Sequence, residues 1–108
     1  MNSGRFQQLS RQFLERTRQE AELFAESMQR ARNNDSQALL ALLHIAHRVH
    51  GSGAMLGFKS ISASAGRIEH VLRSANGTMV AADWRAIEVA YATLLVELAN
   101  AEGQTAHD

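Results

Sequence analysis

The chain has 108 residues, of which 45% are hydrophobic, and its 11 basic and 11 acidic side chains leave no formal net charge. This length suits one domain with one modest core, so we expect a single domain over residues 1–108. The balanced charge argues against nucleic-acid binding through a general basic surface. The absence of cysteine excludes a disulfide scaffold, a thiol nucleophile and a cysteine-based zinc site.

The composition also favours helices and a cytoplasmic protein. The sequence has no proline and is rich in residues with high helix propensity. No apolar run approaches the roughly 20 residues that a membrane-spanning helix needs. The N-terminal segment is polar and lacks the apolar core of a signal peptide. We therefore expect an all-α protein in the cytoplasm without membrane contact.

The first predicted helix covers residues 4–31, where apolar and small side chains recur at steps of three and four. Its stripe comprises Phe6, Leu9, Phe13, Thr17, Ala21, Phe24, Met28 and Ala31. The run Asn33-Asn34-Asp35 then interrupts the pattern. We expect Asn34 to be the N-cap of the next helix, with Gln37 as its capping-box partner.

Three further helices are predicted over residues 35–54, 60–75 and 83–101. Gly57 and the pair Asn76-Gly77 are typical turn and stop signals, and Asp83 is the expected cap of the last helix. The three apolar stripes are Leu39, Leu42, Leu43, Ala46 and Val49, then Ile61, Ala65, Ile68, Leu72 and Ala75, then Trp84, Ile87, Tyr91, Leu94, Leu98 and Ala101. Four amphipathic helices with short connections predict an antiparallel up-down-up-down four-helix bundle.

Three of the five histidines, His44, His47 and His50, lie within the second predicted helix. At about 100° per residue, His47 points roughly 110° and His44 roughly 170° away from the core, whereas His50 points only roughly 50° away. We therefore expect His44 and His47 to be exposed and His50 to be half covered. A metal site is an alternative, but this spacing drifts around the helix and no fourth ligand is evident, so we expect no metal.

The outward face around His47 differs from an ordinary solvated helix face, which would carry Glu and Lys. It holds two apolar residues, two histidines, an arginine and a glycine: Leu40, His44, His47, Arg48, Gly51 and Met55. Glycine costs about 1 kcal/mol relative to alanine within a helix. Close approach of another molecule beside His47 would explain a glycine at position 51. Leu40, His44 and Met55 lie on the same outward face, so they are candidate docking residues for that molecule.

One segment of the chain resembles the signature of histidine phosphotransfer (HPt) domains: residues 46–58, AHRVHGSGAMLGF. In that family an aliphatic residue stands two positions after the active-site histidine, and the position after it usually holds a lysine. Glycine and serine follow, and a Leu-Gly pair comes further along. The residues in register are His47, Val49, Gly51, Ser52, Leu56 and Gly57. The family's next helix usually carries an aliphatic-Glu pair, which Ile68-Glu69 matches.

The resemblance implies that His47 carries a phosphoryl group and exchanges it with the aspartate of a response-regulator receiver domain in a two-component phosphorelay. One position departs from the pattern, because His50 stands where the family usually has lysine. The charge of a histidine at neutral pH depends on its surroundings. The candidate residues around the phosphoryl group are His50, Arg48, Gly51 and Ser52.

In such a relay the receiver domain would supply the aspartate, the Mg²⁺ site and most of the catalysis. This chain shows no glycine-rich nucleotide loop and no evident pair of acidic metal ligands. We therefore expect a phosphocarrier without a cofactor of its own, not an enzyme. A hybrid histidine kinase is a further partner that the resemblance allows. A free-standing carrier, a hybrid-kinase domain and a chemotaxis-kinase-type domain fit the sequence equally well.

Two other functions stay open on the sequence alone. One is a module of the same fold that docks a receiver domain without being phosphorylated, which the histidine at position 50 allows. The other is a purely structural helical bundle.

Overall fold

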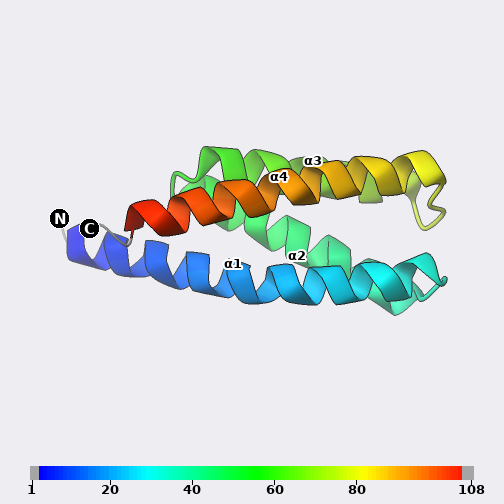
Figure 1. The fold of residues 1–108 in the computed structure, drawn as a ribbon, viewed down its shortest axis with the longest axis horizontal. Helices are drawn as coiled ribbons and strands as arrows, with labels where there is room; N and C mark the ends of the chain where they lie inside the picture. The colour runs from blue at the N-terminus through cyan, green and yellow to red at the C-terminus, as the bar shows by residue number, and fades with distance from the viewer. Residues whose placement is uncertain (1–2, 106–108) are drawn as a thin grey trace.

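The computed structural model describes residues 3–105, so positions 1–2 and 106–108 of the expected domain lie outside the described part. It contains α1 (Ser3–Arg32), α2 (Ser36–Met55), α3 (Lys59–Ala75) and α4 (Ala81–Thr105). Each helix runs opposite to the one before it (Figure 1). The predicted all-α fold, an antiparallel up-down-up-down four-helix bundle, is confirmed.

The first connection differs from the prediction, because Asn34 ends α1 and does not cap α2. Asn34 has a left-handed backbone with φ 68°. Its N–H and that of Asp35 bond back to the carbonyls of Ala31 and Arg30, at 3.1 and 3.2 Å. This is a Schellman ending, in which asparagine tolerates the left-handed position. The N-cap of α2 is Asp35, whose carboxylate accepts the backbone N–H groups of Gln37 and Ala38 at 3.0 and 3.2 Å.

The other connections follow the sequence signals more closely. Gly57 and Gly77 have positive φ angles of 85° and 88°, and Asn76 ends α3 in the left-handed region. The cap prediction for Asp83 is wrong by position, because α4 begins two residues earlier, at Ala81. Asp83 lies in the first turn and accepts the backbone N–H of Val80 at 3.0 Å, which is the reciprocal half of a capping box. At its other end α4 continues beyond the predicted residue 101 to Thr105.

The core lies along the axis of the bundle and is built from the predicted stripes. Its largest fully buried apolar side chains are Phe24, Leu42, Val49, Ile68, Ile87 and Leu98. Phe6 and Leu9 were expected in the first stripe, yet they are 48% and 41% exposed. The first turns of α1 face a surface hollow beside α2, lined also by Met55 and Leu56, and not the core.

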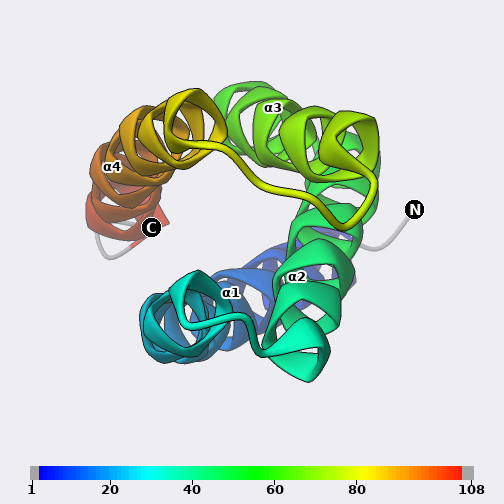
Figure 2. The ribbon, with the colours of Figure 1, turned by 90° about the vertical axis from the view of Figure 1, so that its right-hand side faces the viewer.

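The four helices are not equally close, and α1 and α4 make the fewest contacts of the neighbouring pairs. Viewed from one end, α1 and α4 lie on one side of the bundle and α2 and α3 on the other (Figure 2). Side chains bridge the seam between α1 and α4: Phe24 stacks on Tyr91 with ring centroids 5.0 Å apart, and the Tyr91 hydroxyl donates to the Ala21 carbonyl at 2.7 Å. The α2–α3 pair is packed more closely, so it offers a firmer platform for a functional site. None of the four described helices is long and apolar enough to cross a membrane.

Candidate functional site

Glu69 of α3 joins two histidines of α2 at the most closely packed helix pair. The Glu69 side chain is buried, and each of its carboxylate oxygens contacts one imidazole. Nδ1 of His47 lies 2.8 Å from Oε2, and Nδ1 of His50 lies 3.0 Å from Oε1. The predicted exposure is confirmed, because the His47 side chain is 69% exposed and the His50 side chain 48%.

Arg73 completes the group from the next turn of α3. Its Nε and Nη2 atoms donate to Oε2 of Glu69 at 3.0 and 2.8 Å, so Arg73 shares that oxygen with His47. The hydrogen bond from His50 is the largest cause that lowers the pKa of Glu69, from an ordinary 4.5 to about 2. Arg73 and His47 lower this pKa further, whereas burial opposes them. Glu69 is therefore ionised at neutral pH.

An ionised Glu69 determines the chemistry of His47. A carboxylate only accepts hydrogen bonds, so the contact at Nδ1 requires a proton on that nitrogen. In a neutral imidazole the other nitrogen, Nε2, is then unprotonated and carries the lone pair. The arrangement thus holds an exposed histidine with its Nε2 atom available as a nucleophile.

Gly66 makes room for the His50 ring one turn before Glu69. A Cβ atom built on Gly66 would lie 3.2 Å from both Cε1 and Nε2 of that ring. Such a separation is tighter than an ordinary carbon contact. The His50 ring therefore rests on the bare backbone of α3, and a Cβ atom at position 66 would require the ring to shift by a few tenths of an ångström.

The other residues predicted around the phosphoryl group lie in different surroundings. Arg48 points to α1, where it pairs with Glu20, donates to Thr17 Oγ1 at 3.1 Å and covers the Phe13 ring. The structure therefore does not bring its guanidinium to Glu69 beside His47. Ser52 is half-buried and lines the hollow between α1 and α2.

Gly51 is exposed, and a Cβ atom there would meet nothing within 4 Å. The packing of this chain therefore does not require glycine at that position. The space beside Gly51 is open to a molecule from outside.

The predicted docking residues lie on the surface of α2. His44 is exposed, and Leu40 and Met55 are 47% and 86% exposed. Met55 also borders the hollow between α1 and α2, which has a volume of about 490 Å³ and includes Phe6 and Leu9. The apolar surface beside His47 thus extends onto α1, which the sequence had not indicated.

Two residues of this site were missed from the sequence. Arg73 was assigned to no role, although its spacing of four residues from Glu69 is the spacing of an ion pair on one helix face. Gly66 gave no signal of its own, because its contact is with a ring on another helix. Within residues 3–105 there is no group of three or more His, Asp or Glu side chains placed to hold a metal ion.

Comparison with known protein families matches residues 8–102 to the Hpt domain, which is most of the chain. The chain belongs to the Hpt domain family. Neither the curated proteins nor the solved structures include a match to it. Membership implies a phosphotransfer role in a two-component phosphorelay, with response regulators as the general class of partner. Hpt domains are phosphocarriers and not catalytic enzymes.

Proposed function

We propose that the chain carries a phosphoryl group on Nε2 of His47 and exchanges it with the aspartate of a response-regulator receiver domain. The observation that carries this proposal is the contact between Nδ1 of an exposed His47 and the buried, ionised carboxylate of Glu69, at 2.8 Å. His50 makes a comparable contact with Oε1 of Glu69, at 3.0 Å, but it is less exposed than His47 and the Nε2 side of its ring lies against Gly66 of α3. Within the described residues no hydrogen bond is seen for the His44 ring.

The transfer step is a displacement at phosphorus. The Nε2 lone pair of His47 forms the N–P bond, while the bond from phosphorus to the aspartyl oxygen of the receiver breaks and that oxygen leaves with the electron pair. The imidazole gains positive charge as the new bond forms, and Glu69 stabilises this charge through the Nδ1–H hydrogen bond. The reverse step returns the group to the aspartate through the same geometry.

The charges around Glu69 fit this step. The phosphoryl oxygens are anionic, and transfer requires cations nearby. Arg73 is a permanent cation that shares Oε2 of Glu69 with His47, so we infer that it compensates for the absence of the family's usual lysine. His50 contributes by holding the second oxygen of Glu69, at 3.0 Å. The receiver supplies the Mg²⁺ ion and the aspartate.

The receiver is proposed to dock over the surface that α2 shares with α1. Leu40 and His44 lie on one side of His47 in the sequence, and Gly51 and Met55 on the other. The exposed side chains of Leu40 and Met55 supply apolar contact area. Gly51 leaves the surface clear, because no part of this chain fills the space above it.

Transfer from a phosphorylated receiver domain tests the proposal. The wild-type chain is expected to gain acid-labile phosphate, and the His47→Gln variant is expected to gain none. If the receiver binds but phosphate moves in neither direction, the result would instead support a docking module that is not phosphorylated. Loss of both binding and transfer across a panel of receivers would support a purely structural bundle.

A further inference from the structure

Helix α4 lacks the charged outer side that a surface helix normally has. Its inner side is buried in the core through Ile87, Ala90, Leu94 and Leu98. Its outer face is also mostly apolar or small, and every member is exposed: Ala82, Arg85, Ala86, Val89, Ala92, Val96, Ala99, Asn100 and Gly103. Val89 and Val96 are 69% and 61% exposed. A contiguous exposed apolar face typically marks a contact with another molecule.

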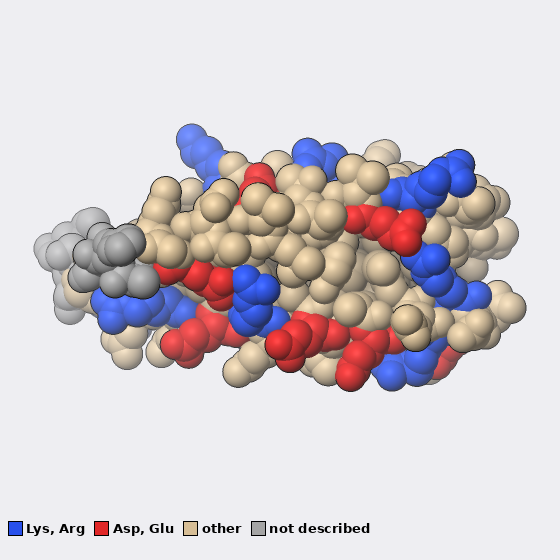
Figure 3. All heavy atoms as spheres, viewed as in Figure 1, with Lys and Arg blue, Asp and Glu red and all other residues tan. Residues whose placement is uncertain are grey.

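The charges of α4 are directed away from this outer face. Three acidic side chains bond sideways to neighbouring helices, each at 2.6 Å: Glu88 to Arg32, Glu97 to Ser64 and Glu102 to Arg18. Among the outer-face positions of the described helix, Arg85 is the one charged residue. Figure 3 shows the result, since the middle of α4 is largely uncharged while acidic side chains gather along α1.

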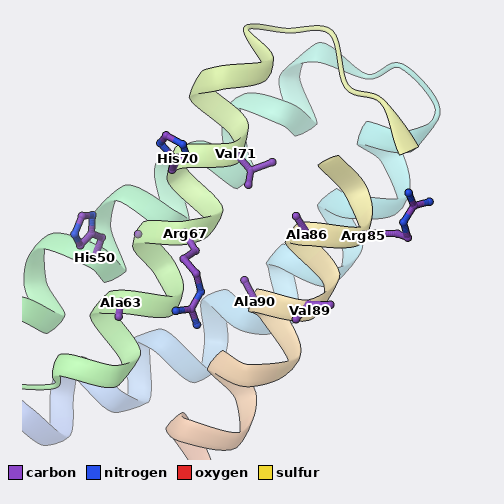
Figure 4. Close-up of a pocket in the computed structure, with 10 residues that line it drawn as sticks. His50, Ala63, Arg67, His70, Val71, Arg85, Ala86, Val89 and Ala90 are labelled. Atoms are coloured by element: carbon purple, nitrogen blue, oxygen red, sulfur yellow. The ribbon is translucent and has the colours of Figure 1, made fainter. Parts of the chain in front are cut away.

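A hollow of about 780 Å³ adjoins one half of this face, between α3 and α4. Six of its lining residues are small or apolar, and the other four are His50, Arg67, His70 and Arg85: the small or apolar ones are Ala63, Gly66, Val71, Ala86, Val89 and Ala90. Figure 4 shows Ala86 and Ala90 on the side of α4 that faces α3, and Arg67 extending between the two helices. His50 and His70 lie on the far side of α3. The half of α4 that includes Val96 does not line this hollow.

We propose that the outer face of α4 binds the outer face of a second copy of this chain, with the two α4 helices antiparallel. A protruding valine and a hollow lined in large part by small and apolar residues then occur on opposite halves of the same face. An antiparallel pair brings Val96 of each copy to the hollow beside Val89 of the other. One surface thus supplies both complementary parts, as a symmetric two-fold interface requires.

The single charge on the face selects the antiparallel arrangement. In a parallel pair, Arg85 would face Arg85 of the second copy, and like charges in contact are unfavourable. In an antiparallel pair centred near Ala92, Arg85 faces Asn100 of the second copy, whose amide oxygen can accept a hydrogen bond. Helices α2 and α4 are not adjacent in the described part of the bundle, so this interface leaves His47 free for a receiver domain.

Sedimentation equilibrium of the full chain tests the dimer. The expected mass is twice the 11.9 kDa of one chain, and Val96→Glu is expected to return it to that of one chain while phosphotransfer persists. Leu23→Glu is the matched control, because Leu23 is 54% exposed on α1 and lies outside the interface. A wild-type chain that stays monomeric at the highest concentration it tolerates in solution would overturn the proposal.

Engineered cysteines test the orientation, since the chain has none of its own. Under oxidising conditions Ala92→Cys is expected to cross-link to its copy, because it lies near the two-fold axis. Ala82→Cys and Ala99→Cys lie away from that axis and are expected to stay uncross-linked. Equal cross-linking at all three positions would indicate a parallel pair, and no cross-linking at any of them would contradict the contact itself.

Discussion

At the scale of single residues, Glu69 is the side chain on which the properties of His47 depend. Its carboxylate holds Nδ1 of His47 at 2.8 Å and is ionised at neutral pH. In Glu69→Gln the amide keeps the shape but loses the charge that stabilises the imidazole during transfer. We expect the transfer rate to fall roughly 10- to 100-fold, by analogy with the loss seen when the hydrogen-bond partner of a metal-binding histidine is removed. Single-turnover transfer from a phosphorylated receiver measures this rate.

The control for that variant is Glu97→Gln, which changes another carboxylate of the bundle. Glu97 accepts a hydrogen bond from Ser64 between α3 and α4 and has no contact with His47. Its transfer rate is expected to match the wild type. An unchanged rate in Glu69→Gln, with the helical circular dichroism spectrum intact, would show that Glu69 does not act on His47.

The lowered pKa of Glu69 also predicts a pH dependence of stability. The folded chain holds this pKa at about 2, against an ordinary value of 4.5. A carboxyl group whose pKa is depressed on folding stabilises the fold at pH values above its ordinary pKa. This stabilisation is lost as the pH falls from 4.5 towards 2. The free energy of unfolding should therefore decline in this range, and less steeply in Glu69→Gln. Urea unfolding at several acidic pH values measures both slopes, and identical slopes would contradict this assignment.

Sequence reasoning predicted the exposure of His44 and His47 correctly, because helical angle depends only on position within one helix. It could not predict which cation lies beside His47. Arg48 is next to His47 in the sequence but turns to Glu20 on α1, whereas Arg73 is 26 positions away and reaches Glu69. Side-chain direction across two helices depends on how they pack, which no local pattern specifies.

At the scale of helices, two glycines predict different effects of the same substitution. Gly51→Ala should raise the free energy of unfolding by about 0.5–1 kcal/mol, because alanine favours helix and its Cβ meets nothing within 4 Å. In Gly66→Ala the Cβ would lie 3.2 Å from the His50 ring, so this gain should be reduced and the ring shifted. Chemical denaturation and the imidazole NMR signals of His50 measure the two effects. Equal stabilisation with unchanged His50 signals would contradict the contact.

The start of α2 gives a second prediction at this scale. Asp35 accepts two backbone N–H groups of the first turn, at 3.0 and 3.2 Å. Asp35→Ala should lower the free energy of unfolding by about 1 kcal/mol, since the two donors lose their acceptor. Ser36→Ala, at the next position, is exposed and should change it much less. Similar losses in both variants would argue against capping by Asp35.

Helix ends also show where sequence signals are ambiguous. Asn34 and Asp35 are both good caps, so the choice between them depends on which residue ends α1. The left-handed backbone at Asn34, φ 68°, assigns it to the end of α1 and leaves Asp35 to begin α2. At Gly57 and Gly77 no neighbouring residue offered a conflicting signal, and the turn at Gly57 and the helix end at Gly77 were predicted correctly.

At the scale of the whole molecule, the fold class followed from periodicity, because four amphipathic stripes with short connections have few other solutions. The spacing between helices was not predictable in the same way. The seam between α1 and α4 depends on the Phe24–Tyr91 stack, and the hollows beside α1 and α4 depend on where large side chains are missing. The α2–α3 pair holds His47, His50 and Glu69 together because it is the closest pair of the bundle.

The most direct test of the account compares two exposed histidines of α2 in one phosphotransfer assay. His47→Gln and His44→Gln change the same residue type on the same helix, but only His47 contacts Glu69. We predict that a phosphorylated receiver transfers acid-labile phosphate to the wild type and to His44→Gln, and none to His47→Gln. Phosphate on the His47→Gln chain at the wild-type level would contradict the assignment of His47 as the phosphoryl carrier.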